Sequence, residues 1–164
     1  MRNAATWMGL IAGFGLLTVN AGVANAQRPG PEALEGRAGA MIQSRPDFAR
    51  VANIYARAAA LRTTADAQAV ADLRLAGLLY ARAGELMRAS AAMESAGARS
   101  LALGNFGAAA EAYTNAAFIA AQAGGRDRSA VLAHRALWLA DREGVSEGLR
   151  ALVHHRLQPK AIAS

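Results

Sequence analysis

The chain contains no cysteine, which excludes disulfides and thiolate metal sites together. Aromatic residues make up only 5% of it, so few large side chains are available to fill a core. Alanine is abundant instead, at 44 of 164 residues. Alanine is the best helix former but buries little apolar area per residue. We therefore expect a fold that relies on helix propensity and on close approach of helices.

The charge is basic and carried almost entirely by arginine, since Lys160 is the only lysine. The formal net charge is +6. A basic balance can indicate nucleic acid, anionic lipid or acidic partners, but a combined excess of alanine and arginine is also typical of a GC-rich genome. The charges are dispersed, and some form pairs at helical spacing, such as Glu85 with Arg88. We expect no nucleic-acid partner in an exported protein.

Residues 1–26 have the pattern of a cleavable secretory signal peptide. Arg2 supplies a positive start, and the apolar run Trp7–Val19 is 13 residues long, shorter than the roughly 20 residues of a membrane span. Ala24-Asn25-Ala26 then forms a small-x-small cleavage site. The pattern predicts a soluble mature chain in a bacterial periplasm or outside the cell, and an uncleaved anchor is the alternative.

Four glycines form the clearest internal order. They lie 20 residues apart, at Gly84, Gly104, Gly124 and Gly144. A helix of about 18 residues followed by a short turn fills such a step, and glycine can adopt the left-handed conformation that ends a helix. The spacing predicts antiparallel helices of matched length, paired into hairpins of about 40 residues.

The remaining segments follow from helical periodicity and turn signals. Residues 27–43, rich in Pro and Gly, read as a linker in which a short helix over Pro31–Ala38 is an option. Residues 44–158 form the helical domain, and 159–164 a C-terminal tail. Helix-start signals lie at Ser44, ahead of Pro46 and Asp47, and at Thr63 with Asp66. We expect five or six helices, at Arg45–Arg62, Ala65–Ala83, Glu85–Leu103, Asn105–Ala123, Asp127–Glu143 and a shorter segment after Ser146.

Part of this pattern resembles the tetratricopeptide repeat. The matching residues are Ala76, Gly77, Tyr80, Gly84, Leu86, Ala89, Met93 and Ala96, with a second partial match at Gly104, Phe106, Ala109, Tyr113 and Ala116. The family period is about 34 residues, whereas the glycine spacing implies 40. The resemblance therefore implies an all-α, TPR-like solenoid of antiparallel hairpins with elongated helices.

The same resemblance suggests a partner-binding surface. It places Arg74, Leu78 and Arg82, four residues apart, on the groove-facing side of the helix Ala65–Ala83. Two guanidinium groups flanking a leucine would hold an acidic or C-terminal peptide segment, because guanidinium binds carboxylate through paired hydrogen bonds. The alternative is that both arginines are simply solvated.

Signals for catalysis, metal binding or a cofactor are weak. The only histidines are His134, His154 and His155. Adjacent histidines on a helix point about 100° apart, so the last two cannot easily share a metal. No nucleophile elbow, phosphate-binding loop or zinc-protease motif occurs. We expect surface histidines, no metal site and no cofactor.

These observations favour a non-catalytic scaffold or adaptor of the bacterial cell envelope. It would bind a partner protein or peptide through a surface of its helical array. The alternative is a closed helical bundle that holds a small apolar ligand between its helices. An enzyme is a third interpretation, which only the histidines favour.

Overall fold

The structure is a computed structural model and describes residues 29–44, 47–62 and 66–157. This part of the chain contains seven α-helices and no strand, so the all-α prediction is confirmed. The helices are α1 (Pro31–Ser44), α2 (Phe48–Leu61), α3 (Ala67–Arg82), α4 (Leu86–Ala102), α5 (Phe106–Gln122), α6 (Arg126–Ala140) and α7 (Glu147–Arg156). The expected signal peptide and C-terminal tail lie outside the described residues. None of the described helices is both long and apolar enough to cross a membrane.

The helix beyond the expected five or six is α1, which occupies most of the segment predicted to be a linker. Its Ala38 is fully buried in a cluster with Val51 and Ala52 of α2. Gly36 and Gly39 lower the helix propensity of this segment, but packing against α2 outweighs that cost. The linker assignment for residues 27–43 was therefore wrong where α1 lies.

Helices α2 and α3 begin at aspartates that follow the predicted start signals. The Asp47 carboxylate accepts a hydrogen bond from the Arg50 backbone N–H at 3.0 Å, and Asp66 accepts one from Gln68 at 2.8 Å. Each aspartate is therefore the N-cap of its helix. Ser44, the first residue of the predicted start signal, is the last residue of α1, and Thr63 lies outside the described residues.

All four periodic glycines adopt the left-handed conformation, with φ between 72° and 84°. After α3, the Glu85 N–H bonds to the Tyr80 carbonyl at 2.9 Å, and the Gly84 N–H to the Ala81 carbonyl at 3.0 Å. This pair of bonds is the Schellman motif. The same pair recurs after α4 and after α5, in each case displaced by 20 residues. The 20-residue step is thus one turn structure used three times.

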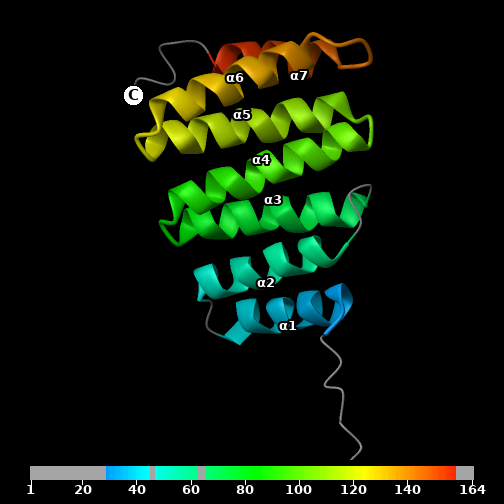
Figure 1. The fold of residues 1–164 in the computed structure, drawn as a ribbon, viewed down its shortest axis with the longest axis vertical. Coiled ribbons are helices and arrows are strands. Elements are labelled where there is room, and N and C mark those ends of the chain that lie inside the picture. The colour runs from blue at the N-terminus through cyan, green and yellow to red at the C-terminus, as the bar shows by residue number, and fades with distance from the viewer. Residues whose placement is uncertain (1–28, 45–46, 63–65, 158–164) are drawn as a thin grey trace, which may run out of the picture.

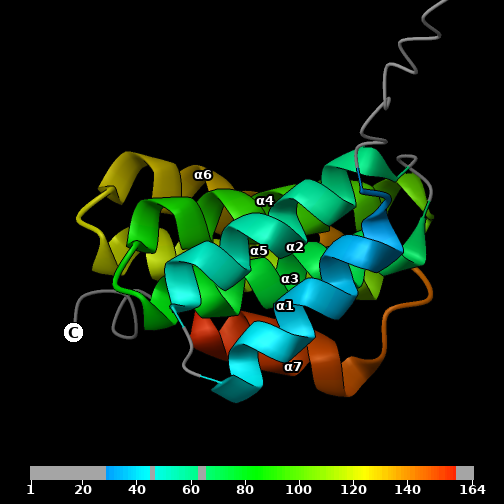
Figure 2. The same ribbon diagram turned by 90° about the horizontal axis from the view of Figure 1, so that it is seen from below.

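The helices pack in chain order into an elongated antiparallel array (Figure 1). α1 lies at one end of the long axis, and α6 and α7 lie at the other, so this arrangement differs from a closed bundle. Viewed along that axis, α1 and α7 lie on the same side of the array (Figure 2). α7 packs against α5 as well as against α6.

The buried core follows the same 20-residue period as the turns. Four alanines at 20-residue intervals are completely buried, namely Ala76, Ala96, Ala116 and Ala136. Close approach also depends on Gly97, because a Cβ atom there would lie 2.9 Å from the ring of Tyr113 in α5. Gly77 meets Met93 in the same way, at 2.9 Å. Each glycine of one helix therefore accommodates a large side chain of the next, which is how an alanine-rich array closes its core.

Candidate binding face

The surface formed by the exposed sides of α3, α5 and α7, here called the odd-helix face, carries two neighbouring hollows. The first, the α3–α5 groove, has a volume of about 510 Å³. It is lined by Ala67, Val70, Ala71, Arg74, Leu75, Leu78, Ser100, Leu103, Asn105 and Ala108. Most of these side chains are apolar, so the groove suits a ligand with apolar groups of its own.

Arg74 and Leu78 both line the α3–α5 groove, as their predicted placement requires. Leu78 is 60% exposed, which is high for a large aliphatic side chain. Arg74 is not free: its guanidinium bonds to the Glu111 carboxylate of α5 at 2.8 Å. Both side chains of this pair are more than a third exposed, so the pair is worth only about 0.2–1 kcal/mol. A charged ligand group could therefore displace it at little cost.

Arg82 does not join the other two residues at the groove. Its guanidinium lies 4.8 Å from the centre of the Phe48 ring at the start of α2. This cation–π contact directs the side chain toward α2 rather than toward α5. The structure therefore brings two of the three predicted binding residues together and separates the third.

The floor of the groove contains a polar atom without a partner. Ser100 of α4 is 1% exposed, and its hydroxyl makes no hydrogen bond within the described part of the chain. A buried hydroxyl without a partner costs free energy, and this one lies beneath the surface of the groove. The polar side chains of the lining that reach the surface are therefore those of Arg74 and Asn105.

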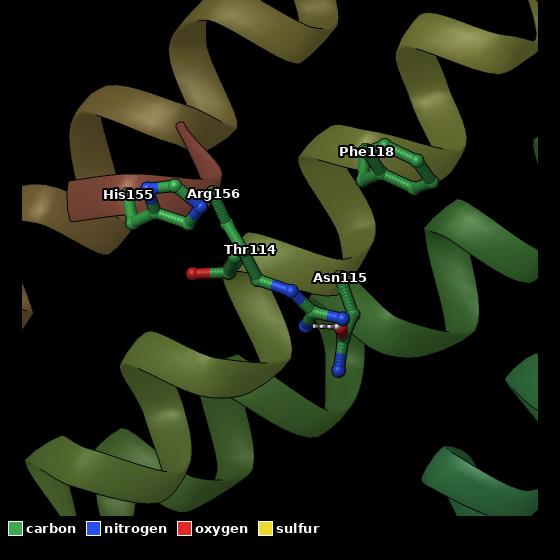
Figure 3. A pocket seen from close by; sticks show the side chains of 5 residues that line it. All are labelled: Thr114, Asn115, Phe118, His155 and Arg156. Carbon is green, nitrogen blue, oxygen red and sulfur yellow. Dashed lines mark hydrogen bonds between the residues drawn. The ribbon is translucent and has the colours of Figure 1, made fainter. Parts of the chain in front are cut away.

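The second hollow, the α5–α7 pocket, has a volume of about 170 Å³. Thr114, Asn115 and Phe118 of α5 line one side, and His155 and Arg156 of α7 line the other (Figure 3). Arg156 extends across the pocket and donates a hydrogen bond to Asn115 Oδ1 at 3.2 Å. The pocket therefore combines an aromatic wall with a cationic one.

The two hollows are related by the internal period. Thr114, Asn115 and Phe118 lie 40 residues after Arg74, Leu75 and Leu78, which line the equivalent side of the first groove. Phe118 is 45% exposed, so both copies of this position present a large apolar side chain to solvent. The face is thus built from one structural unit used twice with different side chains.

Sequence reasoning missed Phe118 and Arg156. The position of Phe118, 40 residues after Leu78, was a signal in the sequence that pointed to it. Arg156 had no such signal, because its approach to Asn115 depends on how α7 docks on α5.

A cluster of charged side chains, some buried and some exposed, lies apart from the odd-helix hollows, where α1, α2 and α3 meet. Arg62 forms ion pairs with the carboxylates of Glu32, Glu35, Asp66 and Asp72. Burial raises the pKa of Asp72, and the negative charge of Glu35 raises it further, against the opposing effects of Gln68 and Arg62. Burial, with Glu35 nearby, thus holds the pKa of Asp72 above its ordinary value.

The histidines give no sign of shared chemistry. His134 and His155 are exposed, and His154 lies 3.0 Å from the Asp141 carboxylate. Across residues 29–44, 47–62 and 66–157, no group of His, Asp and Glu side chains has an arrangement that could hold a metal ion.

No family model matches the chain, and comparisons with curated proteins and with solved structures found no match. The odd-helix face therefore has to be interpreted from its own geometry and chemistry.

Proposed function

We propose that this protein is a non-catalytic scaffold or adaptor that binds a segment of a partner protein across the odd-helix face. Leu78 carries the proposal, because it is 60% exposed beside a groove of about 510 Å³ with a mostly apolar lining. Exposed apolar side chains grouped beside a hollow are typical of interaction sites. Phe118 extends the same apolar surface one repeat along the array.

The groove suggests the chemistry of the partner segment. Apolar side chains would cover Leu78 and the alanines around it. A charged residue would exchange with either member of the weak Arg74–Glu111 pair at the rim. An amphipathic segment meets both requirements.

The proposal also covers the repeat type of the fold and the cellular compartment. We propose that the array is a TPR-like solenoid with a 40-residue unit, supported by the repeated turns and by the equivalent hollows on α3 and α5. The signal-peptide pattern of residues 1–26 supports action in the bacterial periplasm or outside the cell. The partner would then be a protein or peptide of the cell envelope.

Site-specific photo-crosslinking in the native cell tests the proposed face. A photoreactive benzoyl-phenylalanine would replace Leu78 in one strain, Phe118 in a second and Val131 of α6 in a third. Val131 is the control, because it is a 69% exposed aliphatic residue that lines neither odd-helix hollow. We expect the same partner to crosslink at positions 78 and 118 and to be absent at 131.

Quantitative binding to that partner completes the test. Leu78→Ser should weaken the interaction by about 1–3 kcal/mol, since it removes a contact at the centre of the proposed interface, whereas Val131→Ser should leave it unchanged. Equal crosslinking at all three positions, or equal affinity of the two serine variants, would show that the odd-helix face is not the binding surface.

A further inference from the structure

The α5–α7 pocket contains a cation, Arg156, whose only polar contact within residues 29–44, 47–62 and 66–157 is with a neutral group. Arg156 donates one hydrogen bond to the Asn115 amide oxygen, and no carboxylate in the described part of the chain pairs with it. In the equivalent hollow, Arg74 is already paired with Glu111. A guanidinium has five N–H donors, so Arg156 keeps most of its donors available to a ligand.

The neighbouring polar groups determine where an anion would sit. The Asn115 oxygen already accepts from Arg156, so its NH₂ group is left to donate in the same region. The Thr114 hydroxyl donates to the Ala110 carbonyl at 2.8 Å and therefore has no proton to offer. A carboxylate would be held at Arg156 and Asn115, away from the Thr114 hydroxyl.

The size and apolar wall of the pocket restrict the rest of the ligand. A cavity of about 150 Å³ is large enough to hold benzene, and this pocket measures about 170 Å³. Phe118 supplies an aromatic surface on which a ring or a branched chain can pack. An inorganic anion would satisfy Arg156 but would leave this apolar surface uncovered.

We propose that the α5–α7 pocket binds a small organic acid, with its carboxylate on Arg156 and Asn115 and a single apolar ring or short branched chain against Phe118. This site goes beyond partner binding through the odd-helix face, because it requires neither a partner protein nor Leu78. Its ligand needs both parts: the carboxylate is held by charge-assisted hydrogen bonds, and the apolar part by burial.

Titration by two-dimensional ¹H–¹⁵N NMR tests the site with three probes of related structure. Benzoate carries both the carboxylate and the ring, acetate carries only the carboxylate, and benzyl alcohol carries the ring without the charge. We expect benzoate to shift the amides of Thr114, Asn115 and His155 saturably, with a dissociation constant on the order of 1 mM or below. Acetate and benzyl alcohol should each bind about tenfold more weakly, because each lacks one half of the recognition.

Two variants separate the site from general effects of charge. Arg156→Gln removes the guanidinium charge and should weaken benzoate binding about tenfold. Arg82→Gln is the matched control, because Arg82 is an exposed arginine that contacts Phe48 and lies outside the pocket, and it should bind benzoate like the parent protein. Circular dichroism spectra would establish that both variants keep the helical fold.

Several results would overturn the proposal. These are the absence of saturable shifts with benzoate, equal benzoate affinity in Arg156→Gln and the parent, or acetate binding as tightly as benzoate. A short peptide ending in phenylalanine is a fourth probe. If it binds in the pocket while benzoate does not, the site belongs to chain ends of proteins and the small-acid proposal is wrong.

Discussion

Gly97 provides a direct test of how the array is packed. A Cβ atom at this position would lie 2.9 Å from two ring carbons of Tyr113 and 3.1 Å from a third. Tyr113 is only 1% exposed, and the guanidinium of Arg135 lies 5.1 Å from the centre of its ring, so the ring has little room to retreat. Gly97→Ala therefore sets improved helix propensity against a clash in the core.

The magnitudes of the two effects can be compared. Alanine in place of glycine favours a helix by about 1 kcal/mol, whereas overpacking a core typically costs about 1–3 kcal/mol. Gly36→Ala in α1 isolates the first effect, because nothing lies within 4 Å of a Cβ atom there. We expect Gly36→Ala to stabilise the protein. The free energy of unfolding of Gly97→Ala should be about 1–3 kcal/mol lower than that of Gly36→Ala.

Gly77→Ala should fall between these two variants. Its Cβ atom would meet the flexible Met93 side chain at 2.9 Å, which can partly move away, and the Ala89 carbonyl oxygen at 3.3 Å, which cannot. Urea unfolding followed by circular dichroism at 222 nm would measure all three variants. Both the midpoints and the slopes of the urea unfolding curves need to be compared among the variants, because repeat arrays can lose two-state behaviour.

A double mutant makes the reasoning refutable. Tyr113→Leu removes the ring atoms that a Cβ atom at position 97 would contact, so Gly97→Ala should become neutral or stabilising in that background. Two results would show that the α4–α5 contact does not restrict position 97. One is that Gly97→Ala stabilises the parent protein as much as Gly36→Ala does, and the other is that its effect is the same with and without the Tyr113→Leu substitution.

Two further predictions concern charge and turn geometry. Because its pKa in the folded state is raised, Asp72 favours folding most when protonated, and stability falls as the pH rises through that pKa. Asp72→Asn should therefore gain stability over the parent in urea at pH 7, and the gain should shrink toward pH 4; a gain that grows on acidification would contradict this sign. Gly104→Ala should cost about 1 kcal/mol in unfolding free energy, because φ is 72° with no atom near the Cβ position, and Gly104→Asn should cost less. Equal losses for Ala and Asn would show that φ is not the cause.

Local sequence signals predicted the helices from α2 onward to within a few residues. Glycine ends α3, α4 and α5 in the left-handed conformation, and the hydrogen bonds that fix this conformation reach only the turn before it. These helix ends were predictable because they depend on a few neighbouring residues. The same local reasoning failed for α1, whose stability comes from burying residues such as Ala38 against α2. Propensity within a segment carries no information about such a neighbour.

The candidate face was predictable only in part, for a related reason. The resemblance to the tetratricopeptide repeat predicted that Arg74 and Leu78 face a groove, and both line the α3–α5 groove. It could not show that Arg74 would pair with Glu111 or that Arg82 would turn toward Phe48. Each of these contacts joins residues on different helices, and the sequence spacing of such residues does not encode the distance between their side chains.

An all-α chain with a 20-residue step and helix ends at regularly spaced glycines follows from the residues alone, because helix propensity and turn conformation act over a few neighbouring residues. The packed fold was needed to show that α1 joins the array, that Gly97 packs against Tyr113, and that Arg156 bonds to Asn115 beside Phe118. These outcomes depend on how whole helices dock, and docking is decided by side-chain packing between segments far apart in the chain.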